Sequence, residues 1–365
     1  KNKQTPTMLT LKTCLSRNLL KAENILRSTR YCFSENNKNT RNKKCLVFPG
    51  QGAQYVGMTK DIYDEFPYIK ELIQECDDIV GYSLSNTMFN GSIQDLTQTI
   101  KAQPAVLIHS LSLLKVLQNE YNLFKPNNND FQFAMGLSLG EYSALTASNC
   151  FNNNRDAIYL VDKRARAMQE CCIVSDNDDS ENLQQKMLAI MHDGSLTIDK
   201  LQEIIDFNNN NSEYVADIAN YNSSRQIVIS GHKYSLDKIQ KYLKNLDKQK
   251  YKTKYINTGG AFHSSLMKPA KEKLEKVLSN IDINLPFNDN TILANVDATI
   301  VNKTNYKSSE IIKKLLCLQV CSSVNWYPSI IKCIKELGVN EFIEIGPKAT
   351  ISGMIKDICK VNDIE

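Results

Sequence analysis

The sequence predicts an α/β fold with a mainly parallel sheet, into which a smaller βαββαβ unit is inserted. Three observations support this prediction. Short apolar strands alternate with helical stretches along most of the chain, as in parallel sheets that are covered on both faces. Hydrophobic residues make up 42% and charged residues 23% of the 365 residues, which is typical of a protein with a packed core. Residues 186–258 follow a separate β-α-β-β-α-β order.

The larger unit is expected to begin near Cys45 with a short apolar strand at 45–48, which ends in a glycine turn at 49–52. Helices are predicted where apolar residues recur at helical spacing. The further elements expected are helices at 59–66, 68–80 and 102–120, a strand at 131–135, helices at 141–145 and 156–170, a strand at 292–295, helices at 308–317 and 327–337, a strand at 341–345 and a helix at 350–358.

Residues 173–258 form the inserted unit in this interpretation. Strands are expected at 187–191, 214–221, 226–230 and 251–256, and helices at 198–207 and 235–246. This order of elements is that of a ferredoxin-like unit. The insertion divides the larger unit into two stretches of chain, 45–172 and 259–365.

The first 44 residues differ in composition from the rest. They contain eleven Lys and Arg and only two acidic residues, a net charge of +9, which leaves −5 for the remainder of a chain whose total is +4. A remainder with that balance does not favour a nucleic-acid-binding protein. From Met8 onward leucines alternate with basic residues, so residues 1–44 resemble a mitochondrial presequence. We therefore expect a location in the mitochondrial matrix; the alternative is a disordered basic tail.

Membrane spans and metal sites are not expected. No window approaches 18 consecutive apolar residues, the length at which a membrane helix is predicted. The eleven cysteines include no C-x-x-C pair, and without a secretory signal they are expected to stay reduced. The closely spaced ligand pairs that zinc requires are absent from the sequence, so no metal site is predicted.

The most informative short motif is Gly136-Leu137-Ser138-Leu139-Gly140. It lies between an expected strand and an expected helix, which predicts a strand–turn–helix with Ser138 at its apex. Glycine on either side permits a sharp bend. The start of the helix offers free backbone N–H groups to developing negative charge. Ser138 is therefore the candidate nucleophile.

A serine nucleophile needs a base, usually a histidine, and the chain has four histidines. His109 falls in an apolar helical run and is interpreted as a core residue. His192 and His232 stand at the ends of expected strands and are interpreted as loop residues. His263 lies in a loop of small residues, 258–265, at the exit of the inserted unit, where its side chain can reach a cleft between two lobes. His263 is therefore the favoured base.

The glycine turn at 49–52 is the second candidate loop. Its simple interpretation is an ordinary turn between a strand and a helix. In serine enzymes on α/β sheets, however, the oxyanion is bound by the N–H that follows the nucleophile and by an N–H from another strand–helix loop. Here those two N–H groups would belong to Leu139 and Gln51.

Seven motifs together resemble the malonyl-CoA:acyl-carrier-protein transacylase family of type II fatty acid synthesis, in the form expected for mitochondria. They occur in the order of the family and cover 45–358. The resemblance implies a hydrolase-like α/β core with a ferredoxin-like insertion. The motifs are FPGQGAQ at 48–54, GLSLGEYSAL at 136–145, VDKRARAMQE at 161–170, ANYNSSRQIVISG at 219–231, AFHSSLM at 261–267, QVCSSVNW at 319–326 and EIGPKATISGMIK at 344–356.

The resemblance also implies roles for individual residues. Ser138 would carry the malonyl group as an ester, with His263 as its general base and then as the acid for the departing thiolate. The backbone carbonyl of Gln319, rather than a carboxylate, would orient His263. The two N–H groups named above would form the oxyanion hole. Arg164 would bind the free carboxylate of the substrate, since a guanidinium offers two parallel donors. Without the motif, Arg164 would be interpreted as a surface arginine on a helix.

Two positions bear on how far the resemblance extends. Leu137 precedes the serine where the family often has histidine, and leucine occurs in other members. Phe262, before the candidate base, resembles the version of the family that selects malonyl over branched extenders.

The activity expected from the resemblance is ping-pong transfer of a malonyl group from malonyl-CoA to the phosphopantetheine thiol of an acyl carrier protein. No metal or organic cofactor is implied, since CoA is part of a substrate, and a monomer is expected. The first alternative is a serine esterase or thioesterase on a related α/β core, which would need an acidic triad member and have no use for Arg164. The second is a non-enzymatic carrier-binding subunit, which would not need Ser138, His263, Gln51 and Arg164 together.

Seven lysines make the inserted unit basic. The simple interpretation is a solvated helix face and strand edge. The alternative is a docking surface for the phosphates of CoA or for an acidic carrier protein. The lysines are Lys238, Lys241, Lys244, Lys248, Lys250, Lys252 and Lys254.

Overall fold

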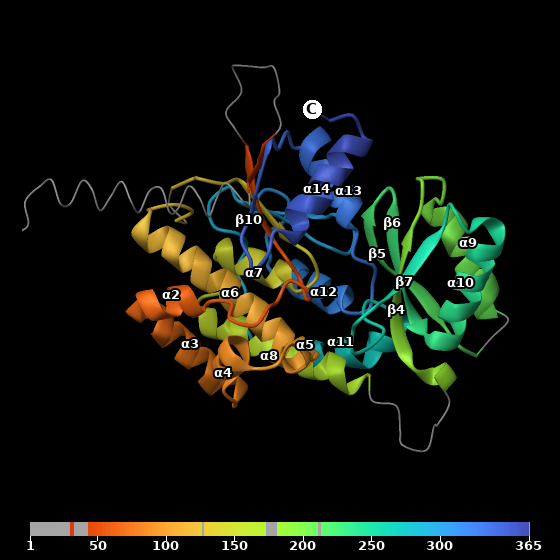
Figure 1. The fold of residues 1–365 in the computed structure, drawn as a ribbon. Coiled ribbons are helices and arrows are strands. Elements are labelled where there is room, and N and C mark those ends of the chain that lie inside the picture. The colour runs from red at the N-terminus through yellow and green to blue at the C-terminus, as the bar shows by residue number, and fades with distance from the viewer. Residues whose placement is uncertain (1–29, 33–42, 126–127, 173–180, 211–212, 365) are drawn as a thin grey trace, which may run out of the picture.

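The computed structural model describes residues 30–32, 43–125, 128–172, 181–210 and 213–364, which form two units built on one β-sheet each (Figure 1). The expected α/β fold is confirmed, and the six-stranded sheet of the larger unit is mixed. Its four central strands run parallel, and the strand at each edge pairs antiparallel with its neighbour. In order across the sheet, the strands are β1 (Arg30–Cys32), β10 (Glu341–Glu344), β2 (Lys44–Phe48), β3 (Phe133–Gly136), β8 (Thr291–Leu293) and β9 (Ile300–Val301).

The central strands are buried on both faces because helices cover both sides of the sheet. On β2, Leu46 and Phe48 point into one core, and Cys45 and Val47 point into the other. The second core is closed by α13 (Trp326–Lys335) and α14 (Thr350–Val361). The elements that contribute to the first core include α3 (Pro67–Val80), α6 (Thr99–Glu120), α7 (Gly140–Ala147), α8 (Asn154–Glu170), α11 (Lys268–Leu278) and α12 (Glu310–Gln319).

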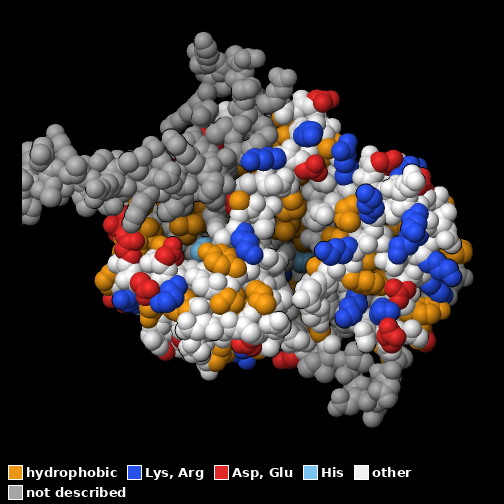
Figure 2. Space-filling view, viewed as in Figure 1, with side chains coloured by type: hydrophobic (Ala, Val, Ile, Leu, Met, Phe, Trp, Pro, Cys, Tyr) orange, Lys and Arg blue, Asp and Glu red, His pale blue; other side chains and the backbone are white. Residues whose placement is uncertain are grey.

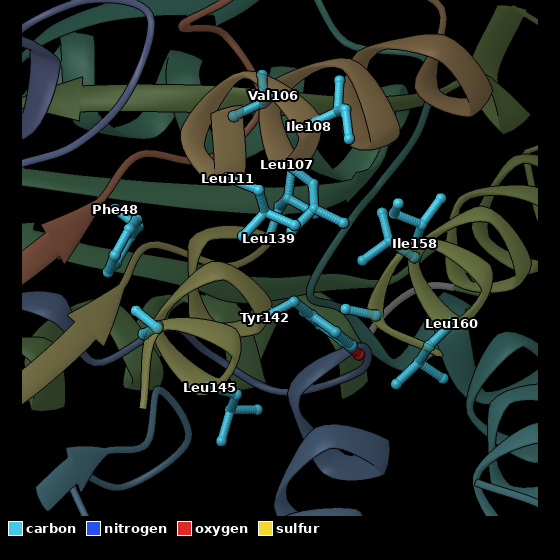
Figure 3. Packing of buried hydrophobic residues seen from close by; sticks show 14 of the residues in the cluster. Phe48, Val106, Leu107, Ile108, Leu111, Leu139, Tyr142, Leu145, Ile158 and Leu160 are labelled. Carbon is cyan, nitrogen blue, oxygen red and sulfur yellow. The ribbon is translucent and has the colours of Figure 1, made fainter. Parts of the chain in front are cut away.

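Helix α6 is the central helix of the first core. Its residues Leu107 and Leu111 pack toward Leu139 and Tyr142 at the start of α7 (Figure 3). By length and composition α6 is the one described helix that could cross a membrane, but 78% of its apolar window is buried inside the fold. Its apolar character is therefore accounted for by the core.

Helix α6 begins at Thr99, earlier than the expected start at 102, and Pro104 lies inside it. Proline lacks an N–H, so the carbonyl of Ile100, four residues earlier, has no helical donor. The hydroxyl of Tyr82 donates to that carbonyl at 2.7 Å. This side-chain bond explains how the helix extends past its proline.

In addition to α3, three helices lie between β2 and α6 along the chain, and two of these three were not expected. They are α2 (Lys60–Glu65), which was predicted, and α4 (Leu84–Asn90) and α5 (Ile93–Thr97), which were not. The hydroxyl of Ser83 accepts from the N–H of Asn86 and that of Ser92 accepts from the N–H of Asp95, so each unexpected helix has a serine N-cap. Both helices are short, which leaves too few residues for a periodic apolar pattern.

The smaller unit is a four-stranded antiparallel sheet with two helices on one face (Figure 1). The helices pack on Leu188, Ile190 and Ile229, and alternate residues such as Met187 and Val228 face the larger unit. In chain order its elements are β4 (Gln185–Met191), α9 (Ile198–Asn210), β5 (Ala216–Ser223), β6 (Gln226–His232), α10 (Lys233–Asp247) and β7 (Lys252–Ile256), and the strands lie in the order β5-β6-β4-β7.

The two units are joined by backbone hydrogen bonds as well as by the chain. Val324, just before α13, bridges in parallel to Asn220 on β5. The N–H of Val324 donates to the carbonyl of Ala219 at 2.8 Å, and its carbonyl accepts from Tyr221 at 3.0 Å. The cleft between the units therefore has a hydrogen-bonded edge.

The expectation that folded structure begins near Cys45, with 1–44 as a targeting or disordered segment, needs one correction. Arg30–Cys32 forms β1, which pairs antiparallel with β10. Without β1, strand β10 would be an edge strand with unpaired backbone groups. The remainder of the targeting prediction falls on residues 1–29 and 33–42, which lie outside the described residues.

The role of Tyr82 gives a test of the core. Replacing Tyr82 with Phe leaves the carbonyl of Ile100 without its donor, so the free energy of unfolding should fall by ~1–3 kcal/mol. Equilibrium urea denaturation measures this change. The control is Tyr68→Phe, because the hydroxyl of Tyr68 donates to Glu120 on the exposed surface and its loss should cost no more than about 0.5 kcal/mol. Equal losses in the two variants would contradict the assignment.

Candidate active site

The turn between β3 and α7 holds Ser138 in a left-handed backbone conformation, with φ of 52°. The expected strand–turn–helix is therefore present. The turn is possible because its glycines approach other backbone atoms too closely for a side chain. A Cβ on Gly136 would lie 2.0 Å from the carbonyl carbon of Gly140, and a Cβ on Gly140 would lie 2.0 Å from the carbonyl oxygen of Phe48. The tight bend presents Ser138 at the start of a helix, in the cleft between the units.

The side chain of Asn295, after β8, holds this turn from outside. Its Oδ1 accepts from the N–H of Ser138 at 2.6 Å, and its Nδ2 donates to the carbonyl of Gly136 at 2.7 Å. Asn295 is 3% exposed, so both bonds are shielded from water. A left-handed conformation is costly for a residue other than glycine, and these bonds offset that cost.

His263 lies directly against the serine. Its Nε2 is 2.7 Å from the Oγ of Ser138, and its Nδ1 is 2.8 Å from the backbone carbonyl oxygen of Gln319. A carbonyl only accepts, so Nδ1 carries the proton and Nε2 presents its lone pair to the serine hydroxyl. The structure thus brings together the serine, the histidine and the carbonyl that the sequence analysis singled out.

The environment of His263 keeps its imidazole neutral. The side chain is 4% exposed, and burial, with a smaller effect from the positive charge of Arg164, lowers the pKa of His263 to about 4. A neutral imidazole can accept the hydroxyl proton at neutral pH. His263 also has a positive φ of 60°, so both members of the pair sit in strained backbone conformations of the kind that cluster at functional sites.

Gln51 and Leu139 both line a cavity of about 490 Å³, together with Ser138 and His263. Gly50 permits the two loops to meet, since a Cβ there would lie 2.5 Å from the carbonyl oxygen of Leu137. Among the described residues, neither the N–H of Gln51 nor that of Leu139 has a hydrogen-bond partner. Two free donors beside a nucleophile can stabilise an oxyanion.

Arg164 is 1% exposed and points from α8 into the same cavity. Its Nη1 donates to Oε1 of Gln103 at 2.5 Å, and its Nη2 donates to Oε1 of Gln319 at 2.9 Å and to Oγ of Ser138 at 3.0 Å. Its Nε makes no hydrogen bond with the residues that the structure describes. Burial lowers the pKa of Arg164, and the nearby side chains of Tyr142 and Glu141 offset only part of that effect.

The other three histidines do not reach the cavity. His109 is buried in α6 and its Nδ1 is 2.9 Å from the hydroxyl of Thr59, as a core residue should be. The Nδ1 of His192 accepts from Gly194 and that of His232 accepts from Val215, both at the ends of strands of the smaller unit. In the described segments, no group of three or more His, Cys, Asp or Glu side chains is arranged to hold a metal ion.

Three of the seven lysines of the smaller unit lie on α10. Figure 2 shows Lys and Arg side chains gathered over the lobe that carries α9 and α10. Lys238, Lys241 and Lys244 lie on α10, which covers the face of the sheet opposite to Met187 and Val228, two residues that line the cavity. For these three lysines, the arrangement favours the simple interpretation of a solvated face.

Three residues of the site were missed from sequence. They are Asn295, Gln103 and Glu141, whose carboxylate accepts from the N–H of Asn295 at 3.3 Å. A polar residue in an otherwise apolar run is the only signal that they give. Gln103 stands in the apolar run of α6, and Glu141 stands at the start of the buried helix α7.

Comparison with known proteins matches residues 45–365 to the family described as the acyl transferase domain. A malonyl CoA-acyl carrier protein transacylase of Bacillus subtilis is 35% identical over 316 residues, covering 87% of this chain and 90% of the relative. One from Staphylococcus aureus is 32% identical over 319 residues, covering 87% and 92%.

Solved structures agree. The malonyl CoA-acyl carrier protein transacylase of Clostridium perfringens has a TM-score of 0.73 at 33% identity, covering 87% of this chain and 90% of that chain. A type II polyketide synthase acyl-carrier protein in complex with its malonyl-transacylase gives a TM-score of 0.74 at 28% identity, covering 87% and 94%.

The burial of His263 predicts an unusual pH dependence. The imidazole is the active base while it is neutral, and its pKa of about 4 means that it stays neutral until the pH falls toward that value. A serine-directed phosphonate probe should therefore label Ser138 at nearly the same rate at about pH 7.5 and about pH 5.5. With an ordinary histidine of pKa 6.5, the rate would fall about tenfold over that interval.

The labelling rate is measured by intact-mass spectrometry, with Ser138→Ala as the unlabelled control and circular dichroism as the check of folding at each pH. A midpoint near pH 6.5 in folded protein would show that His263 is not held neutral by its surroundings.

Proposed function

The chain belongs to the acyl transferase domain family, and we propose that it transfers a malonyl group from malonyl-CoA to the phosphopantetheine thiol of an acyl carrier protein. Relatives called malonyl CoA-acyl carrier protein transacylase match 87% of this chain, and one similar structure contains an acyl-carrier protein in complex with its malonyl-transacylase. The single structural observation that carries the proposal is a buried arginine that forms no ion pair within the described residues and donates at 3.0 Å to the hydroxyl of Ser138.

In the first half of the reaction, the Oγ of Ser138 attacks the thioester carbonyl carbon while Nε2 of His263 takes the hydroxyl proton. An ester bond to Ser138 forms and the carbon–sulfur bond breaks. The CoA sulfur leaves with the proton that the imidazole returns. The distance of 2.7 Å between Nε2 and Oγ supports this transfer, and the bond from Nδ1 to the carbonyl of Gln319 supports the tautomer that it needs.

In the second half, the carrier thiol attacks the ester carbonyl carbon and gives its proton to His263. The new carbon–sulfur bond forms, the ester bond breaks and Ser138 recovers its proton. In both halves the carbonyl oxygen becomes negative, and the N–H groups of Gln51 and Leu139 are the donors that we assign to it. Water must be kept from the ester during the exchange, or the group is lost by hydrolysis.

Arg164 is the residue that we assign to the free carboxylate of the malonyl group. Its partners, Gln103, Gln319 and Ser138, contribute neutral oxygens, so the positive charge is not neutralised, and its Nε–H is without a partner in the described residues. An acetyl group lacks the anion. Loss of a hydrogen bond to a charged group costs about 1.5–3 kcal/mol, which is one to two powers of ten in preference.

The two alternatives have less support. A serine esterase or thioesterase would have an acidic partner for its histidine, but Nδ1 of His263 bonds to a backbone carbonyl. A non-enzymatic carrier-binding subunit has no need of a serine, a neutral histidine and a buried arginine in mutual contact.

We also propose the finer description of the fold. The β-α-β-β-α-β order and the four-stranded antiparallel sheet support a ferredoxin-like small unit at 173–258, and the parallel centre of the large sheet supports a hydrolase-like core made from 45–172 and 259–365. That the protein is a monomer and uses no additional cofactor stays a prediction from the family resemblance.

The experiment that tests the function is intact-mass spectrometry of the protein mixed with malonyl-CoA. We expect a malonyl adduct within seconds in the natural protein and none in Ser138→Ala, and we expect the adduct to disappear when a carrier protein with a free phosphopantetheine thiol is added. Folded protein that gains no mass would contradict the proposal.

The same assay with Arg164→Ala separates a transacylase from an esterase. The variant should lose its preference for malonyl-CoA over acetyl-CoA by about ten- to a hundredfold. An esterase that makes no use of the arginine would show the same ratio with and without it.

The composition of residues 1–44 supports a mitochondrial location, which we propose for the protein. A fusion of these residues to a fluorescent protein should reach the mitochondrial matrix, as seen by co-localisation with a matrix dye. A fusion that stays diffuse in the cytosol would exclude this role for the segment.

A further inference from the structure

The side chain of Gln319 is fully buried and connects three parts of the site. Its Oε1 accepts from Nη2 of Arg164 at 2.9 Å. Its Nε2 donates to the backbone carbonyl of Ser138 at 2.9 Å and to Oε2 of Glu141 at 2.6 Å. Its backbone carbonyl bonds to His263, so the side chain and the main chain of one residue serve different partners.

The chemistry of these partners determines which way the Gln319 amide faces. Arginine has only donors, so the amide oxygen must face Arg164. A carbonyl and a carboxylate only accept, so the two N–H bonds of the amide must face Ser138 and Glu141. If the acceptor on Glu141 were removed, one N–H would lose its partner, and the carbonyl of Ser138 alone would hold the nitrogen side of the amide. Glu141 therefore helps to hold in place the amide whose oxygen accepts from Arg164.

Glu141 is itself an unusual residue to find at this place. It is 2% exposed in the first turn of α7, and no lysine or arginine forms an ion pair with it among the described residues. Its carboxylate is held by the amide of Gln319 and by the backbone N–H of Asn295. Burial raises the pKa of Glu141 to about 7, and those hydrogen bonds and the charge of Arg164 partly offset the rise. An acid buried at this cost is retained only where its contacts have a use.

A second amide completes the support of the guanidinium. Oε1 of Gln103 accepts from Nη1 of Arg164 at 2.5 Å, on the opposite side from Gln319. The arginine is thus oriented by two amide oxygens, which fix its direction without neutralising its charge. A carboxylate in direct contact would fix it equally well but would compete with an anionic substrate.

We infer that Glu141 is a positioning residue for substrate selection: by holding the amide of Gln319, it keeps Arg164 oriented toward the substrate carboxylate. The inference rests on the proposed function, in which Arg164 receives that carboxylate. Asn295 has a different effect, because its side chain bonds to Ser138 and Gly136 and does not contact Arg164. A change at Glu141 should therefore alter the preference between substrates, and a change in the side chain of Asn295 should alter the rate with both substrates.

The test compares kcat/KM for malonyl-CoA and for acetyl-CoA in the natural protein, Glu141→Ala, Glu141→Gln and Asn295→Ala. The malonyl preference should fall about tenfold or more in Glu141→Ala, the size expected for one lost hydrogen bond to a charged group. Glu141→Gln should retain most of the preference, because its amide oxygen can still accept from Gln319. Asn295→Ala should lower both values by the same factor, because it loosens only the serine turn.

Each result has one meaning. An unchanged preference in Glu141→Ala, or an equal loss in Glu141→Gln, overturns the inference and leaves the proposed function intact. A natural protein that shows no malonyl preference and forms no malonyl adduct overturns the proposed function itself. If thermal unfolding shows that Glu141→Ala is not folded, Gln319→Leu replaces it, since leucine keeps the backbone carbonyl that His263 needs. The same tenfold loss of preference is then expected, and its absence is equally decisive.

Discussion

The site depends on one steric constraint: the end of β2 and the turn after β3 approach more closely than any side chain allows. Gly140 faces the carbonyl of Phe48, and Gly50 faces the carbonyl of Leu137, each at a distance that a Cβ would violate. This contact brings the two loops together beside Ser138. An alanine at either glycine would separate the loops. If the two loops supply the oxyanion donors as proposed, that separation would remove electrostatic stabilisation, which is usually the largest single contribution to catalysis.

Next to this contact, a neutral amide keeps the two ionisable side chains of the site apart. The guanidinium of Arg164 and the carboxyl group of Glu141 lie on either side of the Gln319 amide, which bonds to both. Direct contact would give a neutral ion pair with no capacity to bind an anion. The intervening amide bonds to both groups, so one neutral side chain keeps the guanidinium and the carboxyl group apart.

The sequence predicted the features that have a local cause. The strand–turn–helix around Ser138 follows from glycines and apolar runs, and the loop with His263 follows from its place at the exit of the inserted unit. The features it did not predict depend on contacts between distant segments. Asn295 lies 157 residues from the N–H that it accepts from, and nothing in its local sequence indicates that bond. Strand β1 is defined by its pairing with β10, some three hundred positions away.

Family resemblance supplied what periodicity could not. Arg164 stands on a helix with charged neighbours, and only the motif around it separates it from Arg166, which bonds to Asp162 one turn earlier on the same helix. The carbonyl of Gln319 is a similar case, since no pattern of residue types marks a backbone acceptor. Both roles depend on the position of the residue in the fold and not on its type. Residue chemistry alone therefore cannot predict them from the sequence.

The proximity of Arg164 to His263 has a consequence for the timing of catalysis. Burial is the main cause of the weak basicity of the imidazole, and the neighbouring cation weakens it further. A bound carboxylate would neutralise that cation and so increase the proton affinity of the imidazole at the moment when a diacid occupies the cleft. A monoacid would leave the imidazole in its less basic state. In the proposed function, recognition of the acyl group and activation of the attacking hydroxyl would thus be electrostatically linked.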